Sequence, residues 1–193
     1  MSRWEPDTRQ RLESAALDLF VERGFEQTTV PDIATRAGLT TRTFFRHFAD
    51  KREVLFGDED RIPDLATRMV LDAPPELGPM AVVQHTLPTL AVTAFDGRLE
   101  QLLQRRAIIE GNHGLREREL RKMRQVTDAI AAAFRTRGVD DLSACAVAET
   151  AVGIVHVALG RWIDSGGQPP LAEIMNDTFV RLGQAFGEVS YES

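Results

Sequence analysis

The segment around residue 40 concentrates side chains that suit contacts with the base edges of DNA. Thr40, Thr41, Arg42 and Thr43 follow one another in the sequence. Arginine can donate two hydrogen bonds to guanine, and threonine offers a hydroxyl group to base edges and a methyl group to thymine. We expect these four residues to form the first turn of a helix that enters the major groove, where its side chains meet the bases.

Binding of a duplex also requires donors to the phosphates beside the groove. Thr29 stands where a helix is expected to begin, and helix N-termini bind anions. Phe45 and His47 flank the reading segment, and Lys51 stands at the start of the next helix. Positions 36 to 53 hold five arginines and lysines against two acidic residues, whereas the net charge of the chain is −6. A basic element on an acidic body favours local binding to DNA.

Two short helices joined by a glycine turn are predicted to position these side chains. The residues from 28 to 32 are typical of a helix start, with threonine, proline and aspartate, and Gly38 ends that helix. Thr40 caps the second short helix, over residues 41–48. Apolar residues at i, i+3, i+4, i+7 and i+8 predict a longer helix over residues 7–23. The arrangement is that of a helix-turn-helix, whose second helix enters the major groove.

The rest of the chain repeats the helical spacing of apolar residues, and strand signals are weak, so we predict an all-α fold. Asp50 is expected to cap a fourth helix, in which Pro63 introduces a kink. Breaks rich in glycine and proline separate the later helical stretches, which cover residues 80–95, 98–110, 115–136, 142–164 and 171–187. We expect two domains, residues 1–56 and 57–193.

The stretch from Ala144 to Leu159 is apolar on nearly every side. Such a helix must be buried on every side, so we expect one face in the core and another against a second copy. Gly153 and Gly160 permit close approach of helices. The amphipathic last helix is its expected neighbour. We therefore predict a homodimer through about residues 142–164 and 171–187, and a twofold dimer suits a palindromic DNA site.

The composition argues against several other classes of protein. Residues 1–10 are polar, so we expect no secretory signal, and no uninterrupted apolar run approaches membrane-spanning length. The single Cys145 rules out a disulfide within the chain and fits a reducing cytoplasm. Four histidines and one cysteine leave little for a transition-metal site. We expect a cytoplasmic protein with no membrane partner, no cofactor and no metal.

The sequence also resembles a known family. Residues 28–34, 38–39 and 43–51 resemble the signature of the TetR/AcrR family of regulators, as do residues 16–20 and 23–25. The resemblance covers about residues 8–56. It implies a three-helix DNA-binding head, a fourth helix that links head to body, an all-α ligand domain and a homodimer. Residues 57–193 are then the ligand-binding and dimerisation domain, with the last two helices in a four-helix bundle.

The resemblance further implies roles for nine residues. Positions matching Thr29, Phe45 and Lys51 contact phosphates in the family. Positions on or beside its groove-reading face match Thr40, Thr41, Arg42, Thr43, Arg46 and His47. The family most often has tyrosine where Phe45 stands, and the tyrosine hydroxyl binds a phosphate; phenylalanine makes only apolar contacts, to sugar or to a thymine methyl group. The run from Thr43 to Phe48 resembles the mycofactocin-regulator type within the family.

A small-molecule effector is the partner that a ligand domain implies. Pro88 is expected to kink its helix and to help open a pocket. The polar or aromatic candidates for contact with an effector are Arg105, Arg106, Glu110, His113, His156 and Trp162. Surface charge is the alternative explanation for Arg105, and a satisfied core group is the alternative for His156.

Two alternative functions stay open. Glu110 and His113 form a Glu-x-x-His pair, which metal-dependent helical-bundle enzymes use twice. Here the pair occurs once, and Gly111-Asn112 interrupt the helix that it needs. The other alternative is a DNA binder that responds to no ligand. The sequence favours a non-enzymatic regulator, a repressor that a small-molecule effector releases from a pseudo-palindromic operator in double-stranded DNA.

Overall fold

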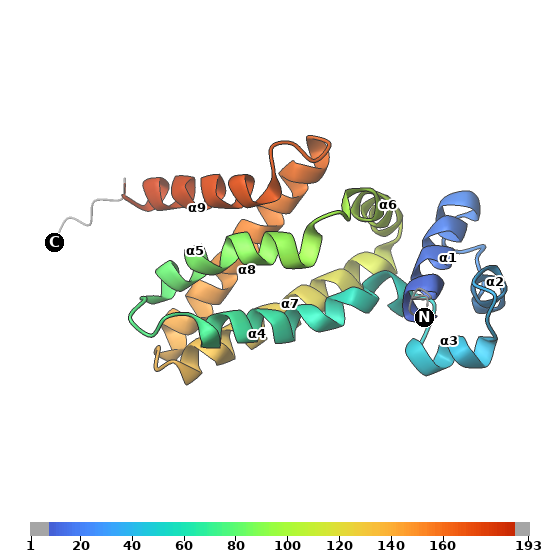
Figure 1. Ribbon diagram of the computed structural model, residues 1–193, viewed down its shortest axis with the longest axis horizontal. Helices are drawn as coiled ribbons and strands as arrows, with labels where there is room; N and C mark the ends of the chain where they lie inside the picture. The colour runs from blue at the N-terminus through green and yellow to red at the C-terminus, as the bar shows by residue number, and fades with distance from the viewer. Residues whose placement is uncertain (1–7, 188–193) are drawn as a thin grey trace, which may run out of the picture. The chain divides into compact units, whose positions relative to one another are not determined.

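The computed structural model describes residues 8–187, apart from the side chains of residues 57–60 and 186–187. The regular secondary structure of this part of the chain is entirely helical, with no strand, which confirms the predicted all-α fold (Figure 1). Helices α1 (Thr8–Arg23), α2 (Val30–Arg36) and α3 (Thr41–His47) come first. The expected absence of a secretory signal concerns residues 1–10, of which residues 1–7 lie outside the described part.

Local caps define the ends of the two short helices. Thr29 forms a capping box with Asp32, since each side chain accepts a hydrogen bond from the backbone N–H of the other residue. Thr40 caps α3 by accepting a hydrogen bond from Thr43 N. Gly38 has a φ of 66°, which residues with a side chain rarely adopt, so glycine suits the tight turn. α2 and α3 thus form the predicted helix-turn-helix.

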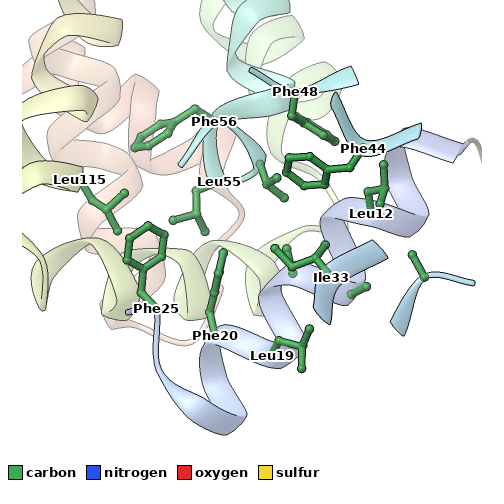
Figure 2. Close-up of a cluster of buried hydrophobic side chains, with 14 of the residues drawn as sticks. Leu12, Leu19, Phe20, Phe25, Ile33, Phe44, Phe48, Leu55, Phe56 and Leu115 are labelled. Atoms are coloured by element: carbon green, nitrogen blue, oxygen red, sulfur yellow. The ribbon is translucent and has the colours of Figure 1, made fainter. Parts of the chain in front are cut away.

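The first compact unit joins two segments, Met1–Asp60 and Glu100–Leu120. The later segment contains most of α6 (Leu99–Glu110) and the start of α7 (His113–Thr136). One cluster of buried side chains holds the unit together (Figure 2), and it includes Leu12, Leu19, Phe20, Phe25, Ile33, Phe44, Phe48, Leu55, Phe56, Ile109 and Leu115. The domain boundary expected at residue 56 does not include residues 100–120 in the first domain. No local pattern in the sequence indicates that Ile109 and Leu115 pack in this cluster.

The segment after α3 is a 3₁₀-helix, η1 (Glu53–Arg61), followed by α4 (Ile62–Asp72). Asp50 caps η1, since its Oδ1 accepts a hydrogen bond from Glu53 N at 2.9 Å. Pro63 lies in the first turn of α4. The predicted kink at Pro63 within one fourth helix is therefore wrong. Proline is favoured in the first turn of a helix, because the N–H groups there have no partner within the helix and the one that proline lacks is not needed.

The second compact unit contains Arg61–Leu99 and Arg121–Ser193. α5 (Pro79–Leu90) contains Pro88 and continues as a π-helical turn, η2 (Ala91–Phe95). α8 (Asp141–Asp164) packs against both α5 and α9 (Leu171–Gly187). The five later helical stretches predicted from the sequence each match these elements to within two residues at either end.

α8 is long and apolar enough, by length and composition alone, to cross a membrane. Seven of its residues are instead buried within the second unit, namely Ala144, Ala148, Ala151, Ile154, Ala158, Trp162 and Ile163. Its other face is uncovered in a single chain, since Val157 is 57% exposed. Nothing lies within 4 Å of a Cβ atom placed at Gly153 or Gly160. Within one copy, α8 is therefore buried on one side only.

Candidate nucleic-acid interface

α3 is anchored in the cluster of the first unit by two aromatic rings. Phe44 is fully buried, and its ring centre lies 5.4 Å from that of Phe48 (Figure 2). Because a helix completes a turn in 3.6 residues, other side chains of α3 must point away from this core. The exposed ones are Thr41, Arg42, Phe45 and Arg46. These four side chains form the face of α3 that is open to another molecule.

Thr40 and Thr43 are engaged with each other. Their hydroxyl oxygens lie 2.9 Å apart, and Thr40 Oγ1 accepts a hydrogen bond from Thr43 N at 3.1 Å. Both residues therefore belong to the cap that starts α3. Thr41 and Arg42, by contrast, have no side-chain hydrogen-bond partner within residues 8–187. Of the four residues expected to read bases, two have a structural role and two have unused donors.

The positive charge of α3 lies on its exposed face. Arg42 and Arg46 are four residues apart, so they occupy the same side of the helix. Arg46 Nη2 lies 3.5 Å from Nε2 of the half-buried His47. α3 contains no acidic residue. Guanidinium groups match both the guanine edge and phosphate oxygens, so this face suits a polyanion that presents hydrogen-bond acceptors.

The N-terminus of α2 already holds a carboxylate of the same chain. Thr29 donates its hydroxyl proton to Asp32 Oδ2 at 2.6 Å, and its backbone N–H donates to the same oxygen at 2.9 Å. These bonds, the side-chain one foremost, lower the pKa of Asp32. A phosphate at this position would meet the charge of Asp32. Contact between Thr29 and phosphate stays a prediction.

Lys51 joins two connections of the first unit. Its Nζ donates to the carbonyl oxygens of Phe25 and Thr28 at 2.7 and 3.0 Å, and lies 3.4 Å from that of Glu26. It also lies 4.3 Å from the centre of the Phe25 ring. An ammonium group has three protons, so these carbonyl groups engage its donors. Lys51 ties the α1–α2 loop to the start of η1, and its expected contact with phosphate stays a prediction.

Two arginines support the helix-turn-helix without having been predicted to do so. Arg11 donates to the carbonyl oxygen of Ala37 at 2.6 Å, at the C-terminal end of α2. Arg36 donates two hydrogen bonds, of 2.9 and 2.7 Å, to the carboxylate of Glu22. This pairing lowers the pKa of Glu22 and raises that of Arg36. The partners are 26 and 14 residues apart, so no local spacing in the sequence indicates them.

Polar contacts also fasten the later segment of the first unit to the earlier one. Arg118 forms ion pairs with Asp50, at 3.0 Å, and with Glu53. Two further contacts are Arg105 Nε to Leu55 O at 2.9 Å and Asn112 Nδ2 to Glu26 Oε1 at 2.7 Å. Arg105 is thus neither a plain surface charge nor a free pocket residue. These contacts span 50 to 86 residues, beyond any local sequence signal.

The remaining effector candidates fall in different units. Arg106, Glu110 and His113 belong to the first unit. Arg106 Nε lies 2.8 Å from Glu110 Oε1, one helical turn away, and the exposed His113 lies 3.6 Å from Glu117. Each of these side chains is thus paired with a neighbour on its own helix. They stay predicted effector contacts that no bound molecule tests.

His156 and Trp162 belong to the second unit. His156 is exposed, so the alternative explanation of a satisfied core group is wrong. Trp162 is only 7% exposed. Its indole Nε1 is the one buried side-chain nitrogen or oxygen that lacks a hydrogen-bond partner within the described residues. A buried donor without an acceptor is rare in proteins and requires an explanation.

Comparison with known families gives two matches that together cover most of the chain. Residues 13–56 match the model of bacterial regulatory proteins of the tetR family. Residues 77–187 match the model described as the MftR C-terminal domain. The transcriptional regulator TcmR of Streptomyces glaucescens is 30% identical over 139 residues. That match spans 69% of this chain and 62% of TcmR.

Solved structures share the fold at lower identity. A TetR-family regulator from Syntrophomonas wolfei gives a TM-score of 0.67 at 15% identity, over 97% of this chain and 98% of the other. The repressor FadR of Thermus thermophilus, in complex with lauroyl-CoA, gives 0.56 at 24% identity. That match covers 96% of this chain and 97% of FadR.

Proposed function

We propose that this chain, which belongs to the TetR family of bacterial regulatory proteins, is a sequence-specific DNA-binding transcriptional regulator. It binds a pseudo-palindromic operator as a homodimer and represses transcription until a small-molecule effector releases it. Its place is the cytoplasm, and it has no enzymatic activity. The regulatory role named for TcmR supports this proposal.

The observation that carries the proposal is the exposed face of α3. Arg42 and Arg46 stand on a helix whose opposite face is anchored by the buried Phe44, and no acidic side chain of α3 neutralises them. Thr41 adds an unengaged hydroxyl group. A convex, cationic helix face with free donors suits the major groove, which is about 12 Å wide and admits one helix.

The test begins with selection of binding sites from a random pool of DNA duplexes by the full chain. Arg42→Ala removes the contact from both half-sites and is expected to weaken binding to the selected site by at least about a hundredfold, since loss of one bidentate base contact costs about ten- to a hundredfold. Binding to an unrelated duplex should change far less, as measured by fluorescence anisotropy. Arg116→Ala, which removes an exposed arginine of α7, is the charge-matched control. The proposal is wrong if no sequence is enriched or if Arg42→Ala binds the selected site normally.

The dimer is proposed to form through α8 and α9. The exposed face of α8 carries the small or apolar residues Ala146, Gly153 and Val157, with the half-buried Gly160 beside them and the exposed His156 among them. Val180 and Gly183 are exposed on α9. Small side chains let helices approach closely, and apolar area is stabilised when it leaves water. Two copies of each helix then form the four-helix bundle that the family resemblance implies.

We place the effector in the second unit, with Trp162 as its contact. An unbonded buried donor costs about 1–3 kcal/mol. An effector with an apolar body and one acceptor oxygen would remove this cost by accepting the indole N–H. The lauroyl-CoA bound by the Thermus thermophilus repressor has an acyl chain with a carbonyl group, so it is a suitable first probe.

Fluorescence provides the test, because the chain has only two tryptophans. In the Trp4→Phe background, an effector should shift the emission of Trp162 and weaken binding to the selected DNA. Trp162→Phe should weaken the response to effector while DNA binding persists. If a broad set of compounds, lauroyl-CoA included, releases no DNA, the protein is a ligand-independent DNA binder. Stoichiometric metal in elemental analysis would instead favour the metal-dependent enzyme.

A further inference from the structure

Phe45 is a large apolar side chain on a face that is otherwise polar and cationic. It is 55% exposed. Its ring meets the ring of Phe44 edge to face, with centres 5.5 Å apart and an angle of 85° between the planes. Since Phe44 is fully buried, it supports the Phe45 ring from the protein side. The other side of the ring faces solvent, where covering it with another apolar group would be favourable.

The major groove offers a specific group for such a ring. Phenylalanine has no donor, so it cannot hydrogen-bond to a phosphate or to a base acceptor. The 5-methyl group of thymine is the apolar group that distinguishes base pairs in the major groove. Thr41 lies four residues before Phe45 and Arg42 three residues before it, so all three side chains are neighbours on the helix surface. The methyl group of Thr41 extends the apolar area, while Arg42 supplies donors beside it.

We propose that Phe45 reads a thymine 5-methyl group in each half of the operator, next to the base pair that Arg42 contacts. The inference rests on the proposed DNA-binding function and makes it more specific. A phosphate contact at this position would strengthen binding to every duplex alike. Contact with a thymine methyl group makes Phe45 a determinant of sequence preference.

The test uses the full chain and the duplex that it selects from a random pool. Each thymine of the selected site is replaced in turn by deoxyuridine, which lacks only the 5-methyl group. Replacement at one position should weaken wild-type binding about fourfold per half-site, the factor for removing one methyl group from an apolar contact. Replacement in both halves of the site should weaken wild-type binding roughly fifteenfold. Phe45→Ala should bind the thymine and deoxyuridine duplexes equally well.

Two controls make the outcome decisive. Val21→Ala shortens an exposed apolar side chain of α1 and should keep the full deoxyuridine effect. Phe45→Tyr adds a hydroxyl group to the ring. We expect this variant to discriminate less than the wild type between the thymine and deoxyuridine duplexes. The inference is overturned if no deoxyuridine position weakens wild-type binding. It is also overturned if Phe45→Ala keeps the deoxyuridine effect, because Phe45 would then contact something other than the thymine methyl group, such as a sugar. Failure to enrich any site would instead overturn the proposed function itself.

Discussion

α3 and α8 both expose side chains that a single chain leaves uncovered, but the chemistry of the two surfaces differs. α3 presents Arg42, Arg46 and Thr41, which carry donors and positive charge, around one aromatic ring. α8 presents mainly glycine, alanine and valine, which carry no side-chain donor, with His156 as the polar residue among them. The first surface remains hydrated until a polyanion replaces the water, whereas the second is stabilised mainly by close packing of small and apolar side chains. Chemical character, more than exposure, separates a nucleic-acid surface from a self-association surface.

The first unit shows a similar division on a smaller scale. Thr29, Thr40, Thr43 and Lys51 are polar residues whose side chains bond to the protein itself. Thr41 and Arg42 have no such partner within the described residues. Substitutions in the first group should act mainly on stability, and substitutions in the second mainly on DNA binding.

The largest expected effect separates the two neighbouring aromatic residues of α3. Phe44→Ala should lower the free energy of unfolding by about 3–5 kcal/mol, because it leaves a cavity in the core. Phe45→Ala should change it by about 0.5 kcal/mol or less, as for an exposed position. Urea unfolding of both variants measures the difference. Equal losses of unfolding free energy in the two variants would contradict a buried face of α3 at Phe44 and an exposed face at Phe45.

The next effect tests the apolar face of α8. Val157→Glu should weaken self-association by at least about a hundredfold, because a carboxylate would be buried against the second copy. Sedimentation equilibrium measures the change. Val92→Glu, at an exposed valine of η2, is the matched control and should leave the dimer intact. If the wild-type protein is a monomer at micromolar concentration, the proposed dimer contact through α8 is wrong.

Lys51 and Arg52 are adjacent cations with different surroundings. Lys51→Met should lower the free energy of unfolding by about 2 kcal/mol, since it removes charged hydrogen bonds to carbonyl oxygens of the α1–α2 loop. Arg52→Met removes the same charge from an exposed position and should be nearly neutral in stability. If Lys51→Met instead unfolds like the wild type but binds all duplexes weakly, its role is contact with phosphate.

A smaller effect is expected at the start of α2. Thr29→Ala should cost about 1 kcal/mol, because the helix loses its capping side chain. Thr35→Ala, at an exposed position inside the same helix, is the control and should cost less. Thermal unfolding resolves the two. Equal changes in Tm would mean that the cap contributes nothing measurable.

The smallest effect concerns pH. Because the pKa of Asp32 is lowered in the folded state, its ionised form stabilises the fold above the ordinary carboxyl range, about pH 4. This contribution is lost as the pH falls through the folded pKa. Asp32→Asn should therefore lower the Tm at pH 7 and have less effect near pH 2. Asp18→Asn removes the same charge from an exposed position on α1 and serves as the control. A pH-independent effect of Asp32→Asn would contradict the role of its charge.

Much of the fold was predictable because its signals are local. Caps, glycine turns and apolar spacing act within one or two helical turns, and the helix bounds followed from them. The predicted kink at Pro63 is wrong because proline suits both a kink and a first turn, and only the change from η1 to α4 decides between them. The core alternative for His156 is wrong because an apolar sequence context does not say which face of α8 is covered.

The sequence by itself determined where the helices begin and end and which helix carries the exposed arginines. The tertiary structure decided which polar side chains are engaged. Arg105, Asn112 and Arg118 find partners 50 to 86 residues away, and Lys51 finds its partners on a loop 23 to 26 residues earlier. Local helix propensity depends on neighbours in the chain, whereas side-chain hydrogen bonding and burial depend on neighbours in space. Only the folded chain therefore separates the polar residues that stabilise the structure from those that remain available to bind DNA.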